Sequence, residues 1–172
     1  RNVRMVYIIE NNGVYGLTKG QFSATADEGQ ELKHAGVNDF PPMDMCMEAI
    51  IAGCGFVARS FSGDATQVRE VMKAALSHRG TALLDIISPC VAFIKLHKLE
   101  EDYDPTDRMG ALHRLQWAQE KDELLTGLVY YNPSRPDLGE TLKLPKTPLS
   151  ALPDERIRPG REVLAGMMSG LM

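Results

Sequence analysis

The sequence is poor in cysteine, carries no excess of positive charge and has no long hydrophobic run. Its three cysteines, Cys46, Cys54 and Cys90, are too few and too irregularly spaced for a disulfide framework, which fits a reducing cytoplasm. The net charge of -4 gives no general attraction to nucleic acid or to a membrane surface, and we expect neither as a partner. The uncharged stretch 49–58 is far shorter than a membrane span, and no basic segment followed by an apolar run suggests secretion.

What the sequence does contain is the composition of a folded domain. Hydrophobic residues make up 44% of the 172 residues and charged residues 24%, a balance that excludes wholesale disorder. This length is enough to bury a hydrophobic core without disulfides or structural metals. Since domains commonly have about 150 residues, we expect one domain with an appendage.

Strand and helix patterns alternate through the first half of the chain. Residues 3–9, 56–61 and 81–87 are short apolar runs, which are typical of buried strands. Residues 43–52 have the composition of a helix, and a second helix with one apolar stripe is expected to begin after a capping aspartate, Asp64. The order strand, helix, strand, helix, strand predicts an α/β fold with a parallel, doubly wound sheet.

The predicted sheet also predicts where a ligand would bind. The carboxyl ends of parallel strands lie at one edge of the sheet, and ligands bind outside that edge. A long loop follows the first strand from Asn11, and the turn 88–90 follows the third. We therefore expect these two segments to lie on the same side of the domain.

The second half of the chain begins with an acidic segment that suits the start of a helix. Asp104, Pro105 and Asp107 fit the N-cap, first and third positions of a helix over about residues 108–123. Residues 124–131 are the next candidate strand. Six of the ten prolines then fall between positions 133 and 159, which predicts a Pro-rich, extended C-terminal extension that ends in a short helix near 161–170.

The segment 11–21, Asn-Asn-Gly-Val-Tyr-Gly-Leu-Thr-Lys-Gly-Gln, is the densest candidate for a binding site. Its glycines allow a ligand to approach the backbone closely. Asparagine and threonine offer neutral oxygen ligands that suit magnesium, and Lys19 adds a positive charge. The spacing is not that of a Walker A loop. These residues alone are equally compatible with a glycine-rich surface turn that binds nothing.

This segment closely resembles the thiamine-diphosphate loop in the catalytic beta subunits of 2-oxoacid:ferredoxin oxidoreductases, especially the 2-oxoglutarate branch. Further segments match the same family, so the resemblance spans nearly the whole chain; they are residues 56–63, 88–93, 103–108, 125–133 and 158–164. The resemblance implies a partial sheet of the thiamine-diphosphate-binding type. It also implies a coenzyme A-dependent oxidative decarboxylation of a 2-oxoacid, with electrons passed to ferredoxin.

The resemblance assigns roles within the loop. It implies that the Asn12 side chain and the Val14 carbonyl bind magnesium (Mg2+), which bridges the diphosphate to the protein. Gly16, Leu17 and Thr18 would flank the diphosphate. Leu17 and Lys19 would face the substrate, where a cation suits the second carboxylate of 2-oxoglutarate.

Cys90 has two interpretations. From the residues alone, a single cysteine after a strand is usually a small buried apolar residue. The resemblance instead implies that Cys90 is one thiolate ligand of an iron–sulfur (4Fe-4S) cluster, with the other ligands upstream of this chain. Cys46 and Cys54 are expected to be packing residues.

The family also has motifs that this sequence lacks. A Gly-Asp-Gly magnesium motif and three cluster cysteines are absent, and the segment after residue 93 is shorter. We expect residues 1–93 to be the C-terminal part of a thiamine-diphosphate-binding domain and residues 94–172 a C-terminal helix and tail. The resemblance implies an alpha subunit, ferredoxin, a 2-oxoacid and coenzyme A as partners. Two alternatives remain open: a non-catalytic interaction module of the same fold, and a thiamine-dependent decarboxylase without a cluster.

Overall fold

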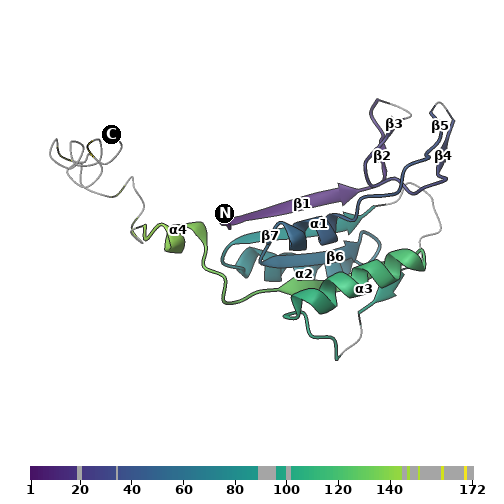
Figure 1. Ribbon diagram of the computed structural model, residues 1–172. Coiled ribbons are helices and arrows are strands. Elements are labelled where there is room, and N and C mark those ends of the chain that lie inside the picture. Colours follow the sequence, from purple (N-terminus) through teal and green to yellow (C-terminus); the bar gives the residue numbers. More distant parts are fainter. Residues whose placement is uncertain are drawn as a thin grey trace. The chain divides into compact units, whose positions relative to one another are not determined.

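The computed structural model of the protein describes residues 1–18, 21–33, 35–88, 96–99 and 102–144, with the single residues 147, 151, 160 and 169. A five-stranded sheet forms the centre of residues 1–138 (Figure 1). The strands lie in the order β1 (Met5–Asn11), β7 (Thr81–Ile87), β6 (Phe56–Phe61), β9 (Leu124–Tyr131) and β8 (Leu96–Lys98). β1, β7 and β6 are mutually parallel, whereas β9 is antiparallel to β6. The predicted α/β fold with a mainly parallel sheet is therefore confirmed.

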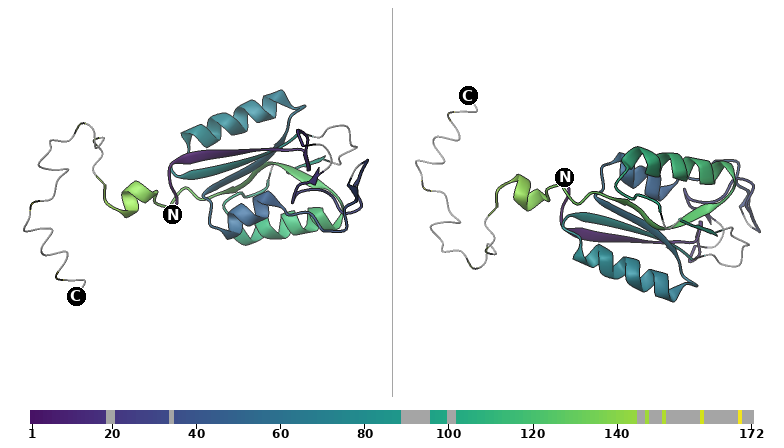
Figure 2. Two further views of the ribbon diagram at one scale, coloured as in Figure 1. Left: turned by 90° about the horizontal axis from the view of Figure 1, so that it is seen from above. Right: turned by 90° about the horizontal axis from the view of Figure 1, so that it is seen from below.

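Helices cover both faces of this sheet. α2 (Ala65–Ser77) lies on one face, and α1 (Met45–Ile51) and α3 (Arg108–Glu120) lie on the other (Figure 2). Each face has its own cluster of buried apolar side chains, because alternate residues of a strand point to opposite faces. Val57 belongs to the cluster under α1 and α3, and its neighbour Ala58 belongs to the cluster under α2. This two-sided covering is the doubly wound arrangement that the sequence predicts.

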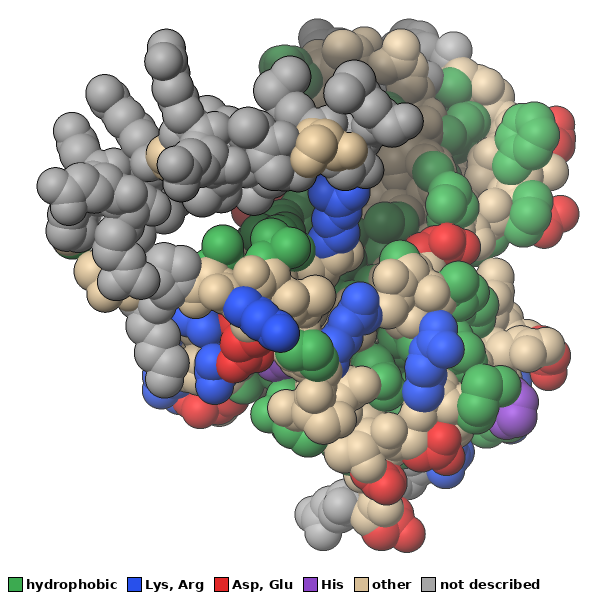
Figure 3. Space-filling view, turned by 60° about the vertical axis from the view of Figure 1, so that its left-hand side comes forward, with side chains coloured by type: hydrophobic (Ala, Val, Ile, Leu, Met, Phe, Trp, Pro, Cys, Tyr) green, Lys and Arg blue, Asp and Glu red, His purple; other side chains and the backbone are tan. Residues whose placement is uncertain are grey.

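β1 differs from the prediction of a buried strand over residues 3–9. It runs from Met5 to Asn11 at the edge of the sheet, and Met5 and Tyr7 are 45% and 53% exposed. An apolar run indicates a strand but not its place in the sheet, so the sequence could not distinguish an edge strand from a central one. Hydrophobic side chains are also exposed among charged ones on the face shown in Figure 3.

α3 begins at Arg108, as predicted, and ends at Glu120, but its N-cap differs from the prediction. Its N-cap is Asp107, which accepts a hydrogen bond from the Met109 amide, and not Asp104. Asp104 instead accepts hydrogen bonds from the amide and hydroxyl of Thr106, which close a local turn. The Tyr131 amide donates to the Pro105 carbonyl at 2.8 Å and so holds this turn against the end of β9. Pro105 therefore lies in this turn, outside the helix.

The long loop predicted after Asn11 contains two small hairpins. β2 (Val14–Tyr15) pairs with β3 (Gln21–Phe22), and β4 (Glu31–Leu32) pairs with β5 (Gly36–Val37). The buried Asn38 side chain fixes the second hairpin, because its amide nitrogen donates to the carbonyls of Ala26, Asp27 and Phe40. The whole excursion then leads into α1.

Residues 139–172 form a second compact unit. The short helix α4 (Leu138–Thr141), which the sequence analysis did not predict, lies at its start. The predicted short helix near 161–170 lies outside the described residues, apart from residue 169. No helix in the described ranges is both long and apolar enough to span a bilayer.

Candidate functional site

The ends of β1 and β7 meet at one edge of the sheet. Asn11 lies opposite Ile87 in the parallel register, and the Ser88 amide donates to the Asn11 carbonyl at 2.7 Å. The segments that leave these two strands therefore start side by side, as the sequence predicts. Pro89 and Cys90 lie outside the described residues, so the structure describes this meeting point only as far as Ser88.

A pocket of about 580 Å³ opens at this edge. This volume is within the usual range of ligand sites. Its lining comes from the end of β1, the first hairpin, the turn that follows it and the first residue of α1. All five residues that the sequence analysis assigned to the cofactor are in this lining; they are Asn12, Val14, Gly16, Leu17 and Thr18. Lys19, the sixth residue assigned to this loop, lies outside the described residues.

Asn12 and Gly13 shape the loop at the mouth of the pocket. The Asn12 side-chain oxygen accepts a hydrogen bond from the Val14 amide at 3.1 Å, which closes a tight turn. Gly13 adopts a φ of 71° inside this turn, a left-handed conformation that favours glycine. At Gly16 an added β-carbon would meet no atom within 4 Å, so the backbone there borders open space.

Val14 offers a backbone oxygen beside the Asn12 side chain. In the first hairpin Val14 lies opposite Phe22. The neighbouring pair, Gly13 and Ser23, is hydrogen-bonded, because the Ser23 amide donates to the Gly13 carbonyl. Because hydrogen-bonded and non-bonded pairs alternate in an antiparallel ladder, the Val14 carbonyl points out of the hairpin. The Asn12 amide oxygen and this carbonyl are oxygen donors, the ligand type that a hard divalent cation binds. The donor set therefore fits a magnesium ion.

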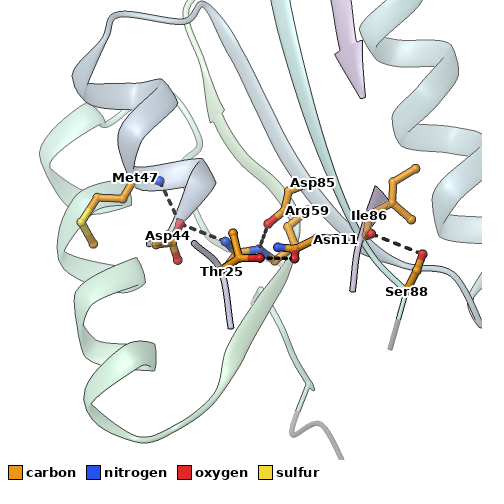
Figure 4. A network of polar contacts seen from close by, with 8 residues as sticks. All are labelled: Asn11, Thr25, Asp44, Met47, Arg59, Asp85, Ile86 and Ser88. Atoms are coloured by element: carbon orange, nitrogen blue, oxygen red, sulfur yellow. Dashed lines mark hydrogen bonds and ion pairs between the residues drawn. The ribbon is translucent and has the colours of Figure 1, made fainter. Parts of the chain in front are cut away.

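The turn 23–25 brings hydroxyl groups to another wall of the pocket. Thr25 Oγ1 donates to Asn11 Oδ1 at 2.6 Å (Figure 4). Thr25 Oγ1 also shares a 2.7 Å hydrogen bond with Ser23 Oγ. All three of these residues line the pocket, as does Ala24 between them. A hydrogen bond connects this turn to the segment that enters α1, because the Met43 amide donates to the Ala24 carbonyl at 2.8 Å.

A buried ion network lies next to the pocket wall. Arg59 on β6 donates from Nε to Asp85 Oδ2 on β7 at 2.8 Å and from Nη2 to Asp44 Oδ1 at 2.9 Å (Figure 4). Asp44 is also the N-cap of α1 and accepts from the Met47 amide. Burial acts to lower the pKa of Arg59, and the neighbouring Cys46, Asp44 and Asp85 raise it by more, so the guanidinium stays charged.

The network was missed by the sequence analysis, although a signal for it exists. A charged Arg59 interrupts the apolar run 56–61, and a charged Asp85 interrupts the run 81–87. Charges inside buried strands require partners, and each of these two is the other's partner. Asp44 lies in a separate segment, so no spacing in the sequence reveals that it joins them.

Cys46 and Cys54 have the packing roles that the sequence analysis expected. Cys46 is fully buried in the core cluster under α1 and α3, and burial raises the pKa of its thiol. Cys54 packs against the same cluster and donates from Sγ to the carbonyls of Phe56 and Thr81.

Two family matches cover most of the chain. Residues 1–86 match the family described as thiamine pyrophosphate enzyme, C-terminal TPP binding domain. Residues 94–146 match a family described as the C-terminal part of the pyruvate ferredoxin oxidoreductase beta subunit.

The chain is also similar to individual proteins. The beta subunit of a 2-oxoacid:ferredoxin oxidoreductase from a Sulfolobus species is 33% identical over 168 residues, which cover 83% of this chain and 53% of that protein. The KorB subunit of the Mycobacterium tuberculosis 2-oxoglutarate oxidoreductase is 36% identical over 94 residues, 54% of this chain and 25% of that protein. The structure also resembles a solved 2-oxoglutarate:ferredoxin oxidoreductase from Magnetococcus marinus, which has 2-oxoglutarate, coenzyme A and succinyl-CoA bound. The two superpose with a TM-score of 0.72 at 30% identity, and the match covers 83% of this chain and 52% of that one. The chain spans at most about half the length of these relatives.

Proposed function

We propose that this chain, which belongs to the family of the beta subunits of 2-oxoacid:ferredoxin oxidoreductases, forms the cofactor-holding part of the catalytic subunit of such an enzyme. The reaction is the coenzyme A-dependent oxidative decarboxylation of a 2-oxoacid to an acyl-CoA, with electrons passed through an iron–sulfur (4Fe-4S) cluster to ferredoxin. The proposed substrate is 2-oxoglutarate, for which several similar proteins are named.

The observation that carries the proposal is the pocket at the carboxyl edge of the sheet. A single loop brings a side-chain oxygen of Asn12 and a backbone oxygen of Val14 to this pocket, beside the open backbone at Gly16. A cofactor diphosphate needs this combination, because its charges are neutralised by a divalent ion with oxygen ligands and its oxygens approach the backbone closely. When bound, thiamine diphosphate supplies the electron sink for decarboxylation.

The charge of the pocket supports a requirement for the metal ion. Among the lining residues that the structure describes, Glu10 is the only one with a charged side chain, and that charge is negative. A diphosphate would therefore enter surroundings that do not neutralise it unless cations accompany it. We propose Mg2+, held by Asn12 and Val14, as the main source of positive charge, with Lys19 placed to bind the substrate carboxylate.

Leu17 supports the proposal that the pocket is completed by other groups. Its side chain is 96% exposed although it lines the pocket. An apolar side chain in this position excludes water once a substrate and a partner surface cover it. We assign that surface to the alpha subunit, and the substrates that meet there to the 2-oxoacid and coenzyme A.

Electron transfer is assigned to Cys90. This cysteine lies two residues after Ser88 in the sequence, and the Ser88 amide donates a hydrogen bond to the Asn11 carbonyl at the edge of the pocket. We propose that the Cys90 thiolate is one ligand of the cluster, since thiolates are the usual ligands of iron–sulfur clusters. The proposal includes the division into residues 1–93, the cofactor-binding part, and residues 94–172, the helix and tail.

The proposal is tested with the complete enzyme that contains this chain. Wild-type enzyme supplied with thiamine diphosphate, Mg2+, 2-oxoglutarate and coenzyme A should reduce ferredoxin, and Cys90→Ala should abolish this reduction. Cofactor-dependent decarboxylation that survives Cys90→Ala unchanged would support a cluster-free decarboxylase. Failure of the wild type to bind the cofactor would support a non-catalytic module.

The substrate assignment has its own test. Lys19→Ala should raise KM for 2-oxoglutarate more than KM for pyruvate, because only 2-oxoglutarate has a second carboxylate. Equal effects on the two substrates would remove the proposed contact.

A further inference from the structure

The ion network of Arg59 joins three elements that are far apart in the sequence. Arg59 is 3% exposed and Asp85 is fully buried, and both lie in the middle of the parallel sheet. Asp44 lies on the segment that enters α1, and its side chain is 11% exposed. The Arg59 guanidinium thus connects the rigid sheet to the start of a helix.

The segment that Arg59 holds is part of the pocket wall. Met45, the residue after Asp44, lines the pocket. Met43, the residue before Asp44, donates from its amide to the Ala24 carbonyl, and Ala24 lines the pocket as well. A shift of Asp44 would therefore move both Met45 and the turn that contains Ala24.

We propose that Arg59 is a positioning residue for the cofactor pocket, which acts through Asp44 to hold the start of α1 and the turn 23–25 in place. This inference rests on the function proposed above. Arg59 does not line the pocket itself, so it acts on the cofactor through the wall and not by contact.

Stability alone does not account for this network. Removing two carboxylates and a guanidinium from water is costly, and apolar residues of similar volume often stabilise a protein as well or better. In the described part of the chain, Asp85 Oδ1 has no hydrogen-bond partner, so the network also leaves one buried acceptor unsatisfied. The arrangement does provide geometry, because the planar fork of arginine holds two carboxylates at fixed directions.

Two variants cut the link between Arg59 and the start of α1 in different ways. In Asp44→Ser the side chain can still cap α1, because serine caps a helix as well as aspartate does, but it is too short to reach Arg59. In Arg59→Lys the positive charge stays between Asp44 and Asp85, but an ammonium cannot bind both with the geometry of the fork. Arg4→Lys is the matched control, since Arg4 pairs with the buried Asp137 near the amino end of β1, away from the pocket.

The experiment measures the dissociation constant of thiamine diphosphate in the presence of Mg2+ by calorimetry, and the midpoint of thermal unfolding, for the complete enzyme. We expect Asp44→Ser and Arg59→Lys to raise the dissociation constant about tenfold or more, since small displacements of binding groups have effects of this size. The effect should appear in the dissociation constant more than in kcat at saturating cofactor. Arg4→Lys should lower the unfolding midpoint and leave the dissociation constant unchanged.

The outcomes separate this inference from the proposed function. Wild-type affinity in both pocket variants, with a lowered unfolding midpoint, would show that the network is structural only and would overturn the inference. An equal loss of affinity in Arg4→Lys would overturn it as well. A wild-type enzyme that does not bind the cofactor would overturn the proposed function, and this inference with it.

Discussion

Asn38 should control the local stability of the excursion that forms the pocket wall. Its side chain is 7% exposed, and its amide nitrogen donates to the carbonyls of Ala26, Asp27 and Phe40 at 3.1, 3.0 and 2.9 Å. Its own backbone carbonyl accepts from the Gly29 amide. One buried side chain therefore donates hydrogen bonds to three backbone carbonyls.

The magnitude follows from the hydrogen bonds that are lost. Asn38→Ala removes two donor hydrogens and leaves the carbonyl of the buried Ala26 without this partner, together with the less buried carbonyls of Asp27 and Phe40, which should cost about 1–3 kcal/mol of unfolding free energy. Asn38→Asp has nearly the same shape but sets a carboxylate against these carbonyls, so at neutral pH it should cost more than the alanine variant. Burial and the carbonyls should raise the pKa of the new carboxyl group. The penalty should therefore shrink as the pH falls and the carboxyl group becomes protonated, because it can then donate one hydrogen bond.

The assay is urea unfolding together with amide hydrogen exchange at Gly29 and Asn38, whose N–H groups are bonded within this turn. Asn132→Ala is the control, because the Asn132 side-chain oxygen accepts only local hydrogen bonds from Ser134 and the residue is more exposed. Asn38→Ala within about 0.5 kcal/mol of wild type, the range of ordinary surface substitutions, and with unchanged exchange, would refute the reasoning.

Three further predictions concern the core, the cofactor loop and pH. Leu115→Ala should lower the unfolding free energy by about 3 kcal/mol in urea titrations, since Leu115 is 1% exposed between α3 and the sheet; a loss below about 1 kcal/mol would contradict the packing. Gly13→Ala should lower the unfolding free energy by about 1–2 kcal/mol, because alanine is strained at the Gly13 φ of 71°. Steric overlap adds little, since the nearest atom to the new β-carbon is 3.5 Å away, and an unchanged unfolding midpoint would contradict the backbone strain. Burial lowers the pKa of His78 in the folded protein, so on acidification His78 is protonated in the unfolded chain before it is protonated in the folded one. The free energy of unfolding should therefore fall as the pH drops from about 6.5, the ordinary pKa of histidine, towards the pKa of His78 in the folded protein. His78→Gln should remove that part of the pH dependence of the unfolding midpoint, and identical pH profiles would contradict it.

The strands that the sequence predicts best are the central ones. β6 and β7 have the predicted bounds, because each is a mainly apolar run that ends in turn residues and is buried on both faces. β1 was placed two residues early and in the wrong environment, since only the neighbouring strands decide which strand forms an edge. α3 begins at the predicted Arg108 but is capped by Asp107 and not by Asp104, because the sequence offers two capping aspartates and the pattern alone does not choose between them.

The candidate site also has a part that the sequence predicts and a part that only the fold reveals. The lining residues between Asn12 and Thr18 lie in one short segment, so a resemblance in that segment could identify them together. Arg59, Asp85 and Asp44 come from two strands and a helix cap, and only the fold brings them into contact. Asn38 gave no signal beyond that of a turn residue, because its bonds go to backbone carbonyls whose positions the sequence does not encode.

The most direct test of the account is a calorimetric titration of thiamine diphosphate into the complete enzyme, with and without Mg2+, for wild type, Asn12→Ala and Asn132→Ala. Both asparagines close local turns, but only Asn12 lines the pocket. The account predicts Mg2+-dependent binding by wild type and by Asn132→Ala. It predicts affinity lower by at least about tenfold in Asn12→Ala, since even indirect partners of a metal ion have effects of that size. Equal affinity in all three proteins, or binding that does not depend on Mg2+, would contradict the claim that this pocket holds the metal ion and the diphosphate.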